Sequence, residues 1–343
     1  MDRSAPSRLP LLDGLRGLAA LAVMLFHEAG LHGSRGFLSH SYMAVDFFML
    51  LSGFVLARSF EPKMAAGLGT RRFMVLRLKR LYPLMALGTL IGAAHLAFTG
   101  GEGPLLLLLA LGLAFVPRLA GPAEIFPLNG PQWSLLFELA ANLLHVVVLR
   151  RLPRLAVLAI GGLCLFGVLR AALHYGTLDL GWQENGFWVG LVRTGSAYCL
   201  GVVMARTLSP REAHGELAWL VPMALLPALL CGPMLLPGEL RLYACWAVMA
   251  AGFPLLMLLA LRTGTPARFA PLLDWLGRLS FPLYAVHVPL LTLAALLGRL
   301  HPAFATTARL GGVGMVLGAA ALLAETRFGG RAKPRPALSP ALT

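Results

Sequence analysis

Ten long apolar runs follow one another along the chain, and each is long enough to cross a bilayer as a helix. A membrane-spanning helix needs about 20 predominantly apolar residues. Inside hydrocarbon the backbone polar groups find no water, so each run must satisfy them within its own helix. We therefore predict an all-α, polytopic integral membrane protein with about ten transmembrane helices, at 11–29, 41–58, 80–98, 132–149, 154–173, 187–206, 217–236, 240–261, 281–299 and 308–325.

An eleventh apolar run, 105–116, is shorter than the others. It lies between Pro104 and Pro117 and holds only 12 residues. That length is more typical of a re-entrant or interfacial segment than of a span. We expect this segment not to cross the membrane, so that ten spans and one re-entrant segment make up the eleven hydrophobic segments.

The composition excludes an ordinary soluble protein and a nucleic-acid-binding protein. Hydrophobic residues make up 58% of the chain and charged residues 13%, whereas about a quarter of the residues in soluble domains are charged. Most of the net charge of +14 lies in short loops between apolar runs, where basic residues set the orientation of the spans. The expected partner is thus the lipid bilayer and not nucleic acid. We also expect no metal site and no disulfide, because the four cysteines lie far apart within apolar runs.

The distribution of arginines predicts the topology. Basic residues cluster before the first span, at 58–80 and at 150–154. Cytoplasmic loops are enriched in Lys and Arg, so we expect these loops and both termini in the cytoplasm. The first run has no signal-peptide cleavage site behind it and is expected to remain as a span. The membrane domain is expected over 1–326, followed by a disordered cytoplasmic tail over 327–343.

Two ionisable residues lie on one face of the first span. Arg16 and His27 are 11 residues apart, which brings them within about 20° of the same helix face and roughly 16 Å apart along the axis. An ionisable group inside a span is costly to bury and therefore points to function. The alternative is that Arg16 reaches the lipid headgroups and His27 lies at the opposite interface.

The second span carries a carboxylate at a matching depth. Asp46 lies in the same half of the membrane as His27, so adjacent antiparallel spans would let the carboxylate orient the imidazole. Ser52 and Gly53 follow toward the other side. They are either pocket residues or small residues that let neighbouring helices approach closely.

A basic pair precedes the third span. Arg77 and Arg80 are three residues apart and share a helix face. Two guanidinium groups so placed can clamp an anionic group at the cytoplasmic mouth. Ordinary topology-setting arginines have the same appearance, so charge alone leaves both interpretations open.

Taken together, these segments resemble the membrane acyltransferase-3 family. The resemblance rests on Arg16 and His27 with ten residues between them, on Val45-Asp-Phe-Phe-Met-Leu-Leu-Ser-Gly-Phe54, and on Phe73 leading into Arg77-Leu-Lys-Arg-Leu-Tyr-Pro83. Two later segments extend it, Trp133-Ser-Leu with Glu138 and the Tyr284-Ala-Val-His287-Val-Pro289 span. The matches keep the family's order over residues 11–290.

The resemblance implies an O-acyltransferase of the bacterial inner membrane. Such a protein moves a short acyl group, usually acetyl from acetyl-CoA, to a hydroxyl of a carbohydrate or exported glycan. Acetyl-CoA is then a co-substrate and no permanently bound cofactor is expected. The family roles fall on Arg16 and His27 as the catalytic pair, and on Arg77 and Arg80 as the CoA-binding cluster. Because the chain stops at Thr343, it resembles the stand-alone form without an esterase-like domain.

The remaining candidates are expected around the acceptor. A histidine is the natural general base near neutral pH, and Trp133 or Tyr284 can donate a hydrogen bond to the developing oxyanion. Glu138 is expected in the pocket, about 140° around the helix from Trp133. Trp133 also suits an interfacial aromatic residue, and His287 also suits a core histidine bonded to a neighbouring helix.

The alternative to an enzyme is a transport protein, namely a transporter or flippase for a lipid-linked sugar. Ten spans, interrupted helices and a midplane histidine would suit it, but no inverted repeat is visible between the halves. The sequence leaves open the acceptor and the oligomeric state, a homo-oligomer being one option.

Overall fold

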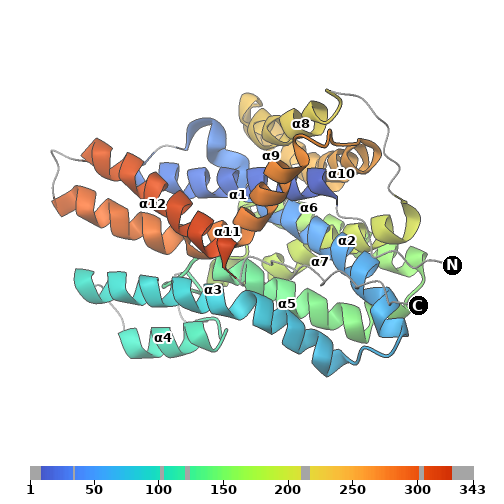
Figure 1. Cartoon of the computed structure of the whole chain (residues 1–343), viewed down its shortest axis with the longest axis horizontal. Coiled ribbons are helices and arrows are strands. Elements are labelled where there is room, and N and C mark those ends of the chain that lie inside the picture. The colour runs from blue at the N-terminus through green and yellow to red at the C-terminus, as the bar shows by residue number, and fades with distance from the viewer. Residues whose placement is uncertain are drawn as a thin grey trace, which may run out of the picture.

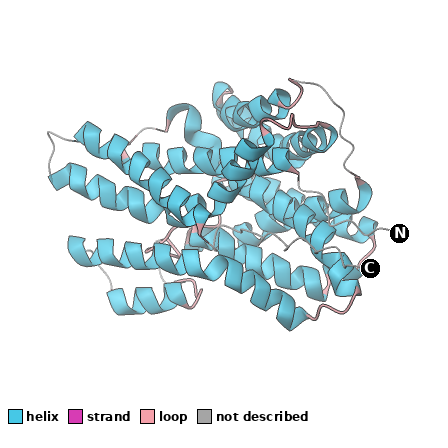
Figure 2. Ribbon diagram, viewed as in Figure 1, coloured by secondary structure: helices cyan, strands magenta, loops and turns pink. Residues whose placement is uncertain are grey.

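The computed structural model describes residues 9–33, 35–100, 104–119, 124–209, 217–300 and 305–326. Within these ranges the regular elements are helices (Figure 2), apart from an isolated β-bridge between Glu124 and Gln183. The α-helices are α1 (Pro10–Leu31), α2 (Ala44–Ala65), α3 (Thr70–Thr99), α4 (Leu105–Leu113), α5 (Gln132–Val147), α6 (Arg154–Tyr175), α7 (Phe187–Thr207), α8 (Leu220–Cys231), α9 (Gly238–Ala247), α10 (Phe253–Arg262), α11 (Ala270–Leu300) and α12 (Ala305–Glu325). Shorter segments are η1 (Gly36–Met43), η2 (Leu149–Arg151), η3 (Glu184–Gly186), η4 (Gly232–Leu235) and the π-helical η5 (Val248–Gly252).

Nine helices in the described ranges are long and apolar enough to cross a membrane. They confirm the prediction of an all-α, multi-pass membrane protein. The run at 217–236 differs from the expectation of a full span, because it forms only a shorter apolar helix, Leu220–Leu235. The α-helix α8 ends at Cys231, and η4 follows at Gly232 with Pro233 as its second residue, since proline cannot donate to the helix ladder and clashes with the preceding turn. The predicted tail, 327–343, lies outside the described residues.

The short run after α3 forms α4, a helix of only 9 residues. Such a helix is about 13.5 Å long, far less than the hydrocarbon core of about 30 Å. It lies alongside α3 (Figure 1), where Leu108 packs in a small cluster with Ala93 and Leu128. The structure thus agrees with a segment that does not cross.

This arrangement predicts that both ends of α4 are reached from the same side of the membrane. We expect single cysteines at Thr99 and Leu119, in a variant otherwise free of cysteine, to react with an impermeant maleimide from one face of sealed vesicles only, and from the same face. Labelling of the two positions from opposite faces would show that α4 crosses.

Helices α1 and α11 pack against each other and run in the same direction, because contacts farther along α1 meet residues farther along α11. Arg16 contacts Ser280 near the start of both helices, and His27 lies beside His287 farther along. The close approach depends on a glycine, because a Cβ at Gly17 would lie 2.6 Å from the carbonyl oxygen of Leu276. The helix pair therefore aligns the two candidate residues of the first span with the late Tyr-His-Pro segment.

Helices α2 and α7 form a second parallel pair. Their backbones touch at Gly53, where no Cβ fits against the carbonyl oxygen of Tyr198, and at Gly201, where none fits against that of Leu50. Gly53 thus has the packing role of a small residue between helices. These two helix pairs, joined by α3 and α5, surround the candidate site.

Candidate functional site

A cavity of about 790 Å³, measured out to its open mouth, lies among α1, α2, α3, α5 and α11. The polar residues that line it are Arg16, Ser52, Arg77, Arg80, Ser134, Glu138, Ser280 and Tyr284. Six of these, all but Ser134 and Ser280, are residues that the sequence singled out.

Three arginines make one part of the cavity basic, and each is held differently. Arg16 donates to Ser280 Oγ at 2.8 Å and to the carbonyl oxygen of Gly277 at 2.7 Å, and it pairs with Asp13 at 3.0 Å. Arg77 is buried. Arg80 is exposed at the cavity, and no hydrogen bond or ion pair joins its side chain to a residue that the structure describes. Its guanidinium donors are therefore available to a bound anion.

Glu138 holds Arg77 inside the cavity. Its Oε1 accepts from Arg77 Nη2 at 2.5 Å and from Ser52 Oγ at 3.0 Å. These three residues come from α5, α3 and α2, so the contacts tie three helices together at the site. Ser52 is consequently a polar residue of the cavity, while its neighbour Gly53 serves helix packing.

Tyr284 stands at the end of the cavity nearest to the histidines. Its hydroxyl lies 2.6 Å from Ser134 Oγ and 3.4 Å from the carbonyl oxygen of Pro131. The ring centroid of His287 lies 5.7 Å from that of Tyr284, and the ring of His27 lies 5.1 Å beyond, centroid to centroid from His287. The two imidazoles do not line the cavity itself; Tyr284 connects it to them.

His287 has a defined hydrogen-bonding pattern. It is fully buried, and its Nδ1 lies 2.9 Å from the carbonyl oxygen of Tyr284 and 3.2 Å from that of Leu283. Both neighbours are acceptors, so Nδ1 carries the proton and Nε2 bears a lone pair. Nε2 has no partner in the described chain.

The expected pairing of Asp46 with His27 is not what the structure contains. Arg193 of α7 binds both oxygens of the Asp46 carboxylate, Nη2 to Oδ2 at 2.6 Å and Nε to Oδ1 at 3.2 Å. The reason is that α2 packs along α7, and a guanidinium fits a carboxylate with two hydrogen bonds. The ring beside His27 is that of His287.

Trp133 likewise lies away from the cavity. It packs against the Arg193 guanidinium, whose Cζ is 5.6 Å from the Trp133 ring and 5.7 Å from that of Tyr42. Trp133 and Glu138 thus point to different partners, as the angle between them on the helix predicts.

In the loop before α7, burial raises the pKa of Asp179 above its ordinary value, with the nearby Arg193 charge opposing the shift.

Arg193 is the residue that the sequence interpretation missed. The sequence analysis did not single it out, yet its side chain is 1% exposed and donates hydrogen bonds to Asp46 and to the carbonyl oxygen of Leu180. The signal was present, because an arginine within an apolar run must find an anionic partner or water. The depth of Arg193 in the membrane did not reveal which carboxylate would be its partner.

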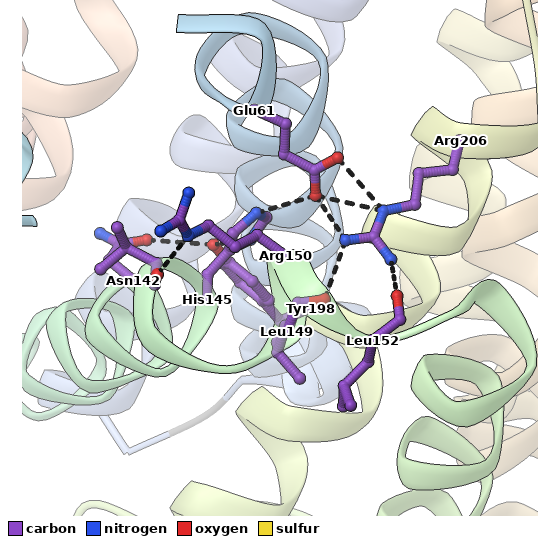
Figure 3. Close-up of polar contacts among 9 residues, drawn as sticks. Glu61, Asn142, His145, Leu149, Arg150, Leu152, Tyr198 and Arg206 are labelled. Carbon is purple, nitrogen blue, oxygen red and sulfur yellow. Dashed lines mark hydrogen bonds and ion pairs between the residues drawn. The ribbon is translucent and has the colours of Figure 1, made fainter. Parts of the chain in front are cut away.

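A second polar network lies outside the cavity (Figure 3). Glu61 of α2 accepts from Arg206 of α7 at 2.6 Å and lies 3.1 Å from Nε2 of His145, whose Nδ1 lies 3.0 Å from the Tyr198 hydroxyl. Arg206 also donates to backbone carbonyls of the turn between α5 and α6. Together with the Asp46–Arg193 pair, this network fastens α2 to α7 near both ends. No motif in the sequence marked it.

Comparisons with known proteins bear on the chemistry of this site. A protein-family model described as "Acyltransferase domain" matches residues 9–324. A curated protein from Rhizobium radiobacter, "Protein 2 in picA locus", is 37% identical over 164 residues, which cover 42% of this chain and 84% of that protein. No solved structure matches the chain significantly.

Proposed function

The chain belongs to this acyltransferase family, and from that premise we propose that it transfers a short acyl group, acetyl from acetyl-CoA, to a hydroxyl of a carbohydrate or exported glycan. The observation that carries the proposal is the exposed, unpartnered Arg80 at a cavity lined by Tyr284, whose ring lies 5.7 Å from that of His287, centroid to centroid. The site thus joins anion binding to a general base.

The donor is expected to enter from the side of the arginines. The phosphates of CoA cannot enter hydrocarbon unaided, so we assign them to Arg80 with Arg16 and Arg77 beside it. The pantetheine arm then extends along α1 toward His27, over the roughly 16 Å that separate Arg16 from His27. Acetyl-CoA is cytosolic, and we therefore place this mouth on the cytoplasmic side of the inner membrane, in keeping with the positive-inside rule.

Each step of the transfer has a residue to perform it. His27 accepts the proton of the acceptor hydroxyl as that oxygen attacks the thioester carbonyl. The Tyr284 hydroxyl donates to the oxyanion that develops. When the carbon–sulfur bond breaks, the CoA thiolate takes the proton from His27, so acetyl ester and CoA thiol are formed and the imidazole is neutral again.

Arg80→Ala is expected to weaken the binding of acetyl-CoA by ~1.5–3 kcal/mol, the scale of a hydrogen bond to a charged group, or about 10- to 150-fold in Kd. Arg80→Lys should recover only part of the lost binding free energy, because the lysine ammonium is a point charge, whereas the planar guanidinium of arginine can donate two hydrogen bonds to one phosphate. Calorimetric titration of the purified protein measures the effect. Lys79→Ala, which removes an exposed neighbouring cation outside the cavity, is the matched control. Equal affinity of Arg80→Ala and Lys79→Ala would contradict the assignment.

The reaction class and the side of entry are tested together in sealed proteoliposomes of one orientation. Acetyl-CoA added on the Arg80 side should release CoA thiol when a glycan acceptor is present, and none should form from the opposite side. A transporter would move the glycan without consuming acetyl-CoA. Movement of glycan without thiol release would therefore replace the proposal with the transporter alternative.

A further inference from the structure

We infer that His287 is the positioning residue for His27: its unpartnered Nε2 accepts a hydrogen bond from the His27 ring nitrogen that faces it, which leaves the other His27 nitrogen free to act as the base. This inference rests on the proposed function of His27. It replaces the carboxylate that the sequence suggested for that task.

The first support is the state of His287 itself. Its Nδ1 proton is committed to the carbonyl oxygens of Leu283 and Tyr284 in the preceding turn of α11. The ring is thereby locked in orientation and in tautomer. A fully buried lone pair that finds no donor is costly, yet Nε2 has none in the described chain.

The second support is the placement of His27. The two ring centroids are 5.1 Å apart and the rings are inclined by 53°, on helices that Gly14 and Gly17 hold in close contact. His27 itself makes no hydrogen bond to the part of the chain that the structure describes. A rotation of the His27 ring that turns one nitrogen toward His287 would supply the donor that Nε2 lacks.

The third support concerns the carboxylates. A catalytic histidine is usually oriented by a third group that accepts from its second nitrogen, most often a carboxylate or a carbonyl. Here Asp46 is bound by Arg193, and Glu28, the residue next to His27, is bound by Arg309 at 2.9 Å. His287 lies beside the ring and offers an acceptor without a partner. A neutral acceptor orients His27 without adding a buried negative charge where acetyl-CoA must approach.

Two substitutions separate this role from a purely structural one. The amide of glutamine reaches the position of Nε2, whereas the amide of asparagine occupies the position of Nδ1. We expect His287→Gln to keep kcat within about ten-fold of wild type, while His287→Asn loses about 100-fold, each with an unchanged KM for acetyl-CoA. If the bonds to the helix carbonyls were all that mattered, Asn would be active and Gln inactive, and the inference would be overturned.

A measurement that keeps His287 in place does not depend on whether the His287 variants fold. In protein labelled with ¹⁵N-histidine, the Nε2 resonance of His287 should shift when His27 is replaced by Ala, because its donor is lost. An unchanged resonance would refute the contact. The resonance does not require turnover, so the contact can be tested even in inactive protein. The activity assays separate the two proposals. Wild-type protein that never consumes acetyl-CoA would end the proposed function, whereas active wild type together with fully active His287→Asn and His287→Phe would end only this inference.

Discussion

His27→Ala is expected to lower the rate of acyl transfer by ~10²–10⁴, the usual contribution of a general base, while the protein stays folded in the membrane. The ring packs against those of Phe26 and His287 and makes no hydrogen bond within the described residues, so its removal breaks no ion pair or hydrogen bond there. Binding of acetyl-CoA should change little, because the phosphates are assigned to the arginines. The assay is the release of CoA thiol with acceptor present.

The control for this result is His174→Ala. That side chain is exposed on α6 and contacts the ring of Tyr175, so it should leave the rate unchanged. Gel filtration and melting in detergent establish that both variants are folded. Full activity of folded His27→Ala would rule out His27 as the base and with it the proposed mechanism.

The largest loss of stability is expected on breaking the Asp46–Arg193 pair. The two side chains are 2% and 1% exposed, so removing one leaves a buried charge without a counter-ion. Such changes typically cost about 3–5 kcal/mol. Asp46→Asn and Arg193→Met should each lower the melting temperature sharply and reduce the yield of inserted protein.

The double variant Asp46→Leu/Arg193→Met shows whether Asp46 serves only as the partner of Arg193 or also takes part in the reaction. An apolar pair of similar volume can replace a buried ion pair at little cost, so the double variant should regain most of the stability and the acyl-transfer rate. If it is stable but inactive, Asp46 takes part in the reaction, as the sequence first suggested. If the single variants melt like wild type, the pair contributes nothing to stability.

Helix geometry accounts for much of what the sequence could predict. The spacing of Arg16 and His27 placed both on one face, and both indeed meet α11, at Ser280 and His287. Arg77 and Arg80 likewise share a face and line one cavity. Each of these statements depends on residues of a single helix, whose periodicity is known in advance.

The errors concern which helices are neighbours. Asp46 and His27 lie at a matching depth, but depth does not determine which helix stands opposite. The contact of α2 with α7 depends on glycines that let two backbones touch, and the same packing brought Arg193 to Asp46. The shortened run at 217–236 shows a further limit, since hydropathy alone ignored the effect of Pro233 on α8.

The pairing of α1 with α11 also affects how the protein is made. The Arg16–Ser280 contact joins residues 264 positions apart, and ribosomes add about 5–20 residues per second. A newly inserted α1 therefore waits about 13 to 50 seconds in the bilayer before Ser280 and His287 reach Arg16 and His27, with Asp13 of the same helix as the partner of Arg16. Chains interrupted before α11 would keep these polar groups facing lipid or passing helices, a state that membrane proteases and chaperones can recognise. The same contact that completes the candidate site thus distinguishes a finished chain from an unfinished one.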